Sequence, residues 1–178
     1  LIQVNAPSSY TGDNEGLRER TVDFNFKQSS GGLNSLITSL TIKGETGNVG
    51  VGSDAPTQKL DVDGTIRFGT SNISSGTYTF TASAGSAVTA DSTAVGNATA
   101  IEYTIFASHH SSGIQSQKVL IMDNGSTAYS NEFAVMFSSS LLISFSADLV
   151  GAAVRLRGTP ESGISGNISI KFIKTIIE

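Results

Sequence analysis

Apolar and polar residues alternate along much of the chain, which is the pattern of β-strands that bury one face. In residues 21–27, Val22, Phe24 and Phe26 fall on one face and polar residues fall on the other. A polar, glycine-containing break follows, and the alternation resumes at residues 36–44. A hairpin is the simplest connection between two such strands, so we expect two paired, half-buried strands here.

The alternation becomes denser in the C-terminal part of the chain. Strand faces are expected at Ile101, Tyr103 and Ile105, at Phe133, Val135 and Phe137, at Leu141, Ile143 and Phe145, and at Val150, Ala152, Val154 and Leu156. Arg155 and Arg157 would face away from the last group, and the Asp-Asn-Gly sequence at residues 123–125 is a tight-turn signal. Six to eight short strands without a helical period indicate an all-β fold that ends in an antiparallel, jelly-roll-like β-sandwich.

Apolar residues are sparse between residues 69 and 100, which predicts a division of the chain near residue 75. Residues 1–75 would form one β-rich module, and residues 76–178 would form the sandwich. Within the second part, residues 76–100 are expected to be thin strands or a linking segment.

Charge and composition exclude several classes of function. Only 15% of the 178 residues are charged, and the formal net charge is −4, so the basic surface of a nucleic-acid-binding protein is missing. Serine and threonine together number 45, which suits strands and turns. The absence of cysteine excludes disulfides and thiolate zinc sites. We expect no signal peptide and no membrane span, and the start at Leu1 indicates a fragment or a processed product.

The segment GNVGVGSDAPTQKLDVDGTIRF at residues 47–68 allows two interpretations. Gly50, Gly52 and Ala55 match the Gly-x-Gly-x-x-Ala pattern of dinucleotide-binding loops. That pattern requires a following helix and an acidic residue about twenty positions later. Turn-forming residues follow at once, and residues 69–76 contain no acidic residue. The lysine of a P-loop is missing as well, so we expect no nucleotide and no other cofactor.

In the structural interpretation, each residue type of this segment has a role. Val49 and Val51 form a short strand between glycines, which let neighbouring backbones approach closely. Pro56 fixes a tight bend. Leu60 and Val62 point inward, and an Asp-Gly turn follows them.

Residues 47–66 resemble a module of bacteriophage tail fibres and related virion proteins, whose pattern runs Gly-Asn-Val-Gly-Ile-Gly-x-x-x-Pro-x-x-x-Leu-x-Val-x-Gly-x-Ile. Val51 stands where isoleucine is usual, and the similarity extends over about residues 17–68. The resemblance implies an intertwined homotrimeric β shaft. Its trimer interface would contain Val49, Val51, Leu60, Val62, Ile66 and Phe68.

The resemblance also implies a function. The chain would be a virion structural protein, the distal part of a tail fibre, joined to other virion proteins upstream of residue 1. Its tip would attach to a receptor on the bacterial surface, either a glycan or an outer-membrane component, and three copies would gain avidity from multivalency. The alternative is a purely structural appendage, such as a spike, whisker or decoration protein, whose tip nucleates trimer assembly.

Receptor contacts are expected on loops, around residues 109–113, 123–131 and 157–166. The candidate residues are His109, His110, Asp123, Asn124, Tyr129, Asn131, Arg157 and Glu161. A solvated surface is the alternative explanation for each of them. Adjacent strand residues point to opposite faces, so at most one of the two histidines would meet a trimer axis, and we expect no metal site.

Catalysis is not expected. Glycoside hydrolysis needs two carboxylates across a cleft, but the acidic residues of the dense region show no pairing. They are Glu102, Asp123, Glu132, Asp148 and Glu161. A Ser-His-Asp triad would have to use one of only two histidines among 27 serines, which is a weak constraint.

Overall fold

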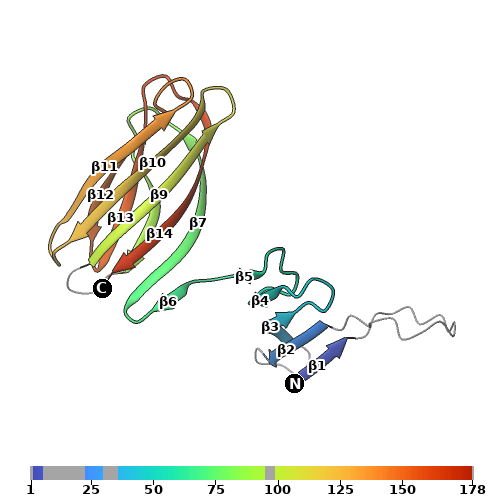
Figure 1. Cartoon of the computed structure of the whole chain (residues 1–178). Coiled ribbons are helices and arrows are strands. Elements are labelled where there is room, and N and C mark those ends of the chain that lie inside the picture. Colours follow the sequence, from blue (N-terminus) through green and yellow to red (C-terminus); the bar gives the residue numbers. More distant parts are fainter. Residues whose placement is uncertain (1, 6–22, 30–35, 95–98, 178) are drawn as a thin grey trace, which may run out of the picture. The chain divides into compact units, whose positions relative to one another are not determined.

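A computed structural model describes residues 2–5, 23–29, 36–94 and 99–177 (Figure 1). These residues form strands and turns and contain no helix, which confirms the expected all-β class. Within them, no helix has the length and apolar character needed to cross a membrane. The chain folds as two compact units, residues 1–64 and residues 65–178.

The strands of the described residues are numbered as in Figure 1. They are β1 (Ile2–Asn5), β2 (Asp23–Ser29), β3 (Leu36–Ile42), β4 (Val49–Val51), β5 (Leu60–Val62), β6 (Ile66–Phe68), β7 (Ser71–Ala82), β8 (Val88–Ala94), β9 (Thr99–His109), β10 (Gly113–Asp123), β11 (Ala128–Phe137), β12 (Ile143–Val150), β13 (Ala153–Pro160) and β14 (Gly166–Ile177).

The division between the units falls after Gly64 rather than near residue 75. β7 pairs with β14 along nearly its whole length, and β8 pairs with β13. The described part of residues 76–100 therefore forms strands of the second unit, the first of the two expected alternatives. These strands are poor in apolar residues because serine and threonine occupy many of their outward positions.

The first unit is a single sheet with the strand order β1-β2-β3-β4-β5. β2 and β3 pair antiparallel, as the hairpin prediction requires, and β4 forms where Val49 and Val51 predicted a strand. β4 and β5 are parallel, and the other pairs are antiparallel.

One face of this sheet is polar and covered. Asn25 and Thr41 are 5% and 0% exposed, and the Thr41 hydroxyl donates a 2.9 Å hydrogen bond to Asn25 Oδ1. The chain after β4 folds over this face, where Pro56 is buried and its carbonyl oxygen accepts a hydrogen bond from Asn48 Nδ2. Burial on this face therefore depends on hydrogen bonds rather than on apolar packing.

The opposite face of the first unit is apolar and open. Strand register aligns its side chains in two rows across β2, β3, β4 and β5. Phe24 and Leu60 are 46% and 61% exposed, although the sequence predicted that Phe24 lies on the covered face of its strand and that Leu60 points inward. Val51 is 42% exposed. The rows are Phe24, Ile42, Val49 and Leu60, and Phe26, Leu40, Val51 and Val62.

Contacts and backbone angles within the same chain explain the glycines of the Gly-Asn-Val-Gly-Val-Gly segment. A Cβ at Gly50 would collide with the Ser53 carbonyl oxygen, because the loop passes directly over β4. Gly52 has a φ of 75°, a left-handed conformation that favours glycine. The pattern that resembled a phosphate-binding loop is thus a close approach of backbone to backbone.

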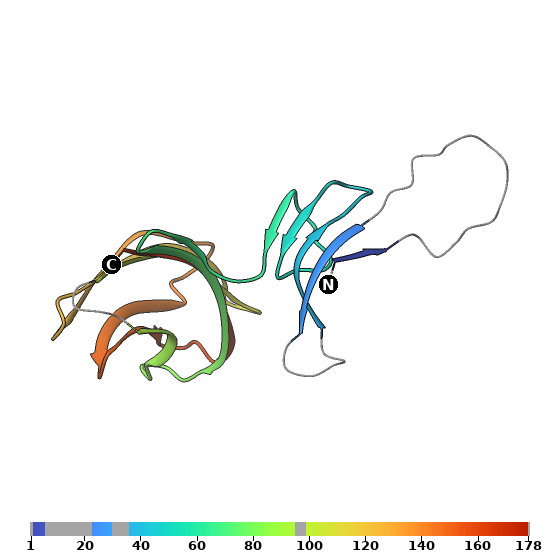
Figure 2. The same ribbon diagram turned by 90° about the horizontal axis from the view of Figure 1, so that it is seen from below.

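The second unit contains two antiparallel sheets (Figure 2). The six-stranded sheet has the order β11-β10-β9-β14-β7-β6, and the three-stranded sheet has the order β12-β13-β8. In Figure 2 the larger sheet curves around the smaller one. Their facing sides share one hydrophobic core, to which β9 contributes Ile101 and Tyr103 and β13 contributes Val154 and Leu156, all 0% exposed.

Side chains close the edge between the two sheets at β11 and β12. β12 is an edge strand, so its outward backbone groups have no neighbouring strand. Gln115 Oε1 accepts hydrogen bonds from the backbone N–H groups of Leu142 (2.7 Å) and Ile143 (3.2 Å), and Gln115 Nε2 donates to the Ile143 carbonyl oxygen (2.7 Å). Glu132 accepts from the Phe145 N–H in the same way. This pairing satisfies an edge that would otherwise be open to other strands.

Two details of the predicted strands were wrong. Ala134, with a φ of 52°, lies at a β-bulge in the β10–β11 pairing, so Phe133 and Phe137 do not continue one alternating face. The run from Val150 to Leu156 is two strands, because β12 ends at Val150 and a turn at Gly151 begins the return through β13. Arg155 and Arg157 do face away from the core, as predicted.

Polar side chains from β8, β9 and β14 form one hydrogen-bonded cluster. The Tyr103 hydroxyl donates to Asp91 Oδ2 at 2.8 Å, and Lys174 Nζ lies 2.6 Å from the same oxygen. Lys174 also donates to the Thr93 hydroxyl at 2.8 Å. Burial, and secondly the negative charge of Asp91, raise the pKa of Tyr103 far above its ordinary value.

Tyr103 is expected to make stability fall at alkaline pH. In the unfolded chain a tyrosine loses its proton near pH 10, while folded Tyr103 keeps its proton. The unfolded state then binds fewer protons, so stability is complete below pH 10 and falls above it by up to about 1.4 kcal/mol per pH unit. Urea unfolding between pH 9 and pH 11 should show a shallower decline for Tyr103→Phe than for wild type. Tyr129→Phe, at a half-exposed position, should leave the slope unchanged; equal slopes for all three proteins contradict the assignment.

Candidate functional site

The predicted receptor-binding residues do not form one site. His109 ends β9, whereas Asp123 pairs with Thr99 at the start of β9, so the first and second predicted loops lie at opposite ends of the second unit (Figure 1). Tyr129 and Asn131 lie on β11, and Arg157 lies on the other sheet. A receptor contact made by all eight residues together is therefore excluded by this arrangement.

The two histidines pack against each other instead of pointing apart. Their ring centroids are 4.5 Å apart, because the strand ends at His109 and His110 begins the turn. His109 is 6% exposed; its Nε2–H donates to the Ser165 carbonyl oxygen at 2.8 Å, and its Nδ1 accepts from the Ser112 N–H at 3.1 Å. Both nitrogens of His109 are occupied, so His109 is a structural residue and only His110 is exposed.

The turn residues Asp123 and Asn124 also serve the fold. Asp123 is 2% exposed, and its Oδ1 accepts the Gly125 N–H at 2.9 Å. Asn124 Oδ1 accepts the backbone N–H groups of Ser126 and Thr127. The prediction that Asp123 contacts a receptor is corrected, because an inward position on β10 keeps its carboxylate from solvent.

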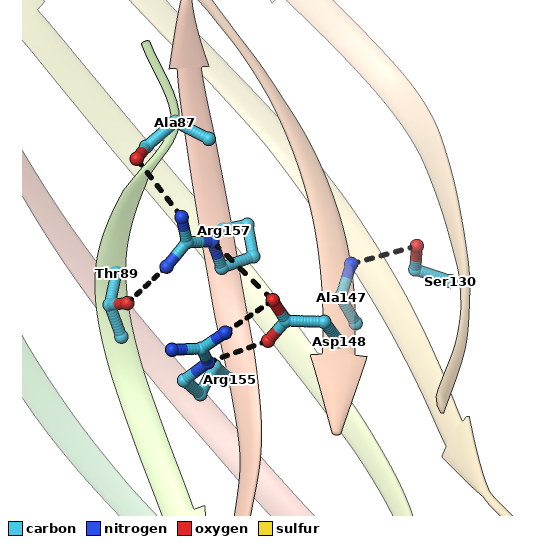
Figure 3. Close-up of polar contacts among 7 residues, drawn as sticks. All are labelled: Ala87, Thr89, Ser130, Ala147, Asp148, Arg155 and Arg157. Carbon is cyan, nitrogen blue, oxygen red and sulfur yellow. Dashed lines mark hydrogen bonds and ion pairs between the residues drawn. The ribbon is translucent and has the colours of Figure 1, made fainter. Parts of the chain in front are cut away.

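Arg157 belongs to a polar cluster on the outer face of the three-stranded sheet (Figure 3). It donates to the Ala87 carbonyl oxygen at 3.0 Å and to the Thr89 hydroxyl, and its Nε lies 3.7 Å from Asp148 Oδ2. Arg155 donates to both oxygens of Asp148, at 2.7 and 2.6 Å. These hydrogen bonds, and then the nearby Arg157 charge, lower the pKa of Asp148. The cluster joins β8, β12 and β13, so the donors of Arg157 are used within the protein.

Three other predicted residues are available to solvent in part. Tyr129 is 50% exposed, and Asn131 is exposed beside it on β11. Glu161 is half-buried, and its backbone N–H donates to the Leu142 carbonyl oxygen at 3.0 Å. Tyr129 and Asn131 belong to a larger surface, the outer face of the six-stranded sheet.

This outer face carries many large apolar side chains. They occupy the outward positions of their strands, and strand register aligns them across the sheet. Each is between 38% and 65% exposed. They are Ile66, Phe68, Ile73, Phe106, Ile114, Leu120, Met122, Tyr129, Phe133, Met136, Ile173 and Ile177. An apolar surface of this extent is typical of an interaction site.

A hollow of about 620 Å³ opens on the same face. That volume is in the range of ligand-binding pockets. β14 supplies Lys171 and Ile173, and β9 supplies Thr104 and Phe106. β7 and β10 complete the lining with Ser75, Thr77 and Ser116. A second hollow of about 280 Å³ shares Phe106 and Ser116 with the first, so the two hollows adjoin at these residues.

Sequence reasoning missed this hollow, although a signal was present. Ile101, Tyr103 and Ile105 define the inward phase of β9, so Phe106 is an aromatic residue at an outward position. Ile173 likewise lies at an outward position of β14, between the inward residues Phe172 and Lys174. Large apolar residues in the polar phase of a strand indicate a surface that contacts something else.

The residues implied as a trimer interface fall in both units. Val49, Val51, Leu60 and Val62 lie on the open apolar face of the first unit. Ile66 and Phe68 belong to β6, the edge strand of the six-stranded sheet, and are 38% and 62% exposed. All six are at least partly accessible in a single chain.

The described residues contain no group of three or more His, Cys, Asp or Glu side chains that could hold a metal ion. Two of the carboxylates considered for catalysis are bound by other side chains and not by each other. Glu102 pairs with Lys118 at 2.6 Å, and Glu132 accepts from Gln117 Nε2 at 2.6 Å.

No family model matches the chain, and a search of curated proteins finds no match either.

Proposed function

We propose that the chain is a structural protein of a phage virion, the distal segment of a tail fibre. Residues of the first unit would form an intertwined homotrimeric shaft, and the second unit would be a jelly-roll-like β-sandwich tip. The tip would attach to a receptor on the host cell surface. The resemblance of residues 47–66 to the fibre module is the starting point for this proposal.

One observation carries the trimeric part of the proposal. The described residues of the first unit contribute no side chain to a buried hydrophobic core, while eight apolar residues form two rows on an open face. Burial of such a face stabilises a protein by about 25 cal/mol per Å² of apolar surface. Because the polar face is already covered by its own chain, other copies are the natural partners for the apolar face.

The adhesive part is supported by the outer face of the six-stranded sheet. It combines an extended apolar surface with a hollow of about 620 Å³. The same surface also suits the alternative, a spike, whisker or decoration protein whose tip only nucleates trimer assembly. The two functions differ in whether the assembled protein binds cells.

Sedimentation equilibrium of residues 1–178 tests the first part. We expect a mass of about three times 18.4 kDa. Fluorescently labelled protein should then adhere to at least one strain in a panel of Gram-negative and Gram-positive bacteria. A trimer that adheres to none of them supports the structural alternative, and a stable monomer contradicts both.

A further inference from the structure

Lys171 differs from the other lysine on the outer face of the six-stranded sheet. Lys118 is paired with Glu102 at 2.6 Å. Lys171 is exposed, lines the 620 Å³ hollow, and has no hydrogen bond or ion pair with any residue in the described part of the chain. In a chain of net charge −4, the hollow therefore holds an uncompensated positive charge.

The groups around Lys171 are of two kinds. Strand register places Phe106 and Thr77 on either side of it, so an aromatic residue and a hydroxyl residue are its neighbours across the sheet. Ser75, Thr104 and Ser116 bring further hydroxyls to the lining. Hydroxyl side chains both donate and accept hydrogen bonds. An aromatic ring offers a flat apolar surface beside them.

These groups together match one class of ligand. A sugar ring has a face of C–H groups that packs on an aromatic ring and a rim of hydroxyls that pairs with serine and threonine. An anionic substituent would pair with the ammonium group, since opposite charges attract most strongly where water is partly excluded. A purely apolar ligand would leave the four hydroxyls and the lysine without partners, which is unfavourable.

We propose that the hollow between β7, β14, β9 and β10 binds a saccharide that carries a carboxylate or phosphate group. Lys171 holds the anionic group, and the Phe106 ring packs against the sugar. The adjoining 280 Å³ hollow, which shares Phe106, accommodates a neighbouring sugar unit. This inference rests on the proposed adhesive function and names the chemistry of its receptor.

A single site of this kind is weak, because one ion pair and one ring contact must offset the cost of ordering a flexible ligand. We expect dissociation constants in the millimolar range. Three copies on one particle would raise the apparent affinity for a repeating polysaccharide by about 100-fold or more.

Saturation-transfer difference NMR on the full chain tests the inference with glucuronic acid, glucose 6-phosphate and glucose. Glucuronic acid tests a carboxylate as the anion, and glucose 6-phosphate tests a phosphate. At least one of these acidic sugars should bind more tightly than glucose, by about 5-fold or more. Lys171→Gln should lower the affinity for the more tightly bound acidic sugar to the affinity for glucose. Phe106→Ser should abolish transfer to the ring protons of all three sugars.

Lys118→Gln is the matched control, because it removes the same charge from the same face outside the hollow. It should retain the preference for acidic sugars. Equal binding of glucose and both acidic sugars to wild type, equal losses in Lys171→Gln and Lys118→Gln, or no transfer to any sugar would each overturn the inference.

Cell adhesion separates this inference from the proposed function. If Lys171→Gln adheres to cells as well as wild type does, the hollow is not the receptor site, while the adhesive function stands. If the wild-type protein is monomeric or adheres to no strain, the proposed function fails whatever the sugar titrations show.

Discussion

Replacing Gln115 with leucine is expected to lower the free energy of unfolding by about 3–5 kcal/mol. Gln115 is 1% exposed and binds both N–H groups and one carbonyl at the start of β12. Leucine fills a similar volume but offers no polar atom. The variant would leave the N–H groups of Leu142 and Ile143 and the Ile143 carbonyl buried without partners, and each such group costs about 1–3 kcal/mol.

Guanidinium unfolding followed by far-UV circular dichroism measures this effect, with wild type and variants compared at one protein concentration. Asn131→Leu is the matched control. It makes the same kind of change on the outer face of β11, where the side chain is exposed, and should stay within about 0.5 kcal/mol of wild type. A Gln115→Leu protein as stable as the control would mean that another group or water already satisfies the β12 edge.

The alternation of the sequence predicted the all-β class because period two is a local property of a strand. Phe24 and Phe26 indicated a strand, and β2 forms there. Which face of β2 is covered is not local information. The loop after β4 supplies the cover, and it buries Asn25 rather than the phenylalanines because the close approach at Gly50 lies on that side.

Turn chemistry was read correctly where its signal was strong and missed where it was weak. The Asp-Asn-Gly sequence forms the β10–β11 turn, but its position in the inward phase of β10 buries Asp123. The turn at Gly151 lies in a run of small and apolar residues that reads as one continuous strand. The sequence therefore predicted the location of the Asp-Asn-Gly turn, but not the burial of the Asp123 side chain in it.

The hollow could not be predicted as a site because its lining comes from four strands far apart in the chain. Thr77 and Lys171 become neighbours only through the pairing of β7 with β14. Phe106 joins them through the pairing of β14 with β9. A sequence can mark each residue as outward-facing, but the topology decides which outward residues meet.

If the chain assembles as proposed, Leu60→Glu is expected to give single chains of 18.4 kDa in place of the trimer. Leu60 is 61% exposed on the apolar face of the first unit, in register with Val49 and Ile42. If that face is buried between copies, each copy would bury a carboxylate among apolar side chains. An unpaired buried charge costs at least about 3 kcal/mol, or about 100-fold in affinity, and a trimer would contain three.

Gln58→Glu adds the same charge two residues away, at an exposed position of the preceding loop. It should leave the mass unchanged, so loss of assembly in Leu60→Glu alone would assign the contact to the apolar rows. The single chains of Leu60→Glu should keep their strand content, because the backbone pairing of residue 60 with Val49 does not depend on its side chain. Leu60→Glu that sediments with the wild-type mass would place the copies' contacts elsewhere. The open row of Phe24, Ile42, Val49 and Leu60 would then need a different partner.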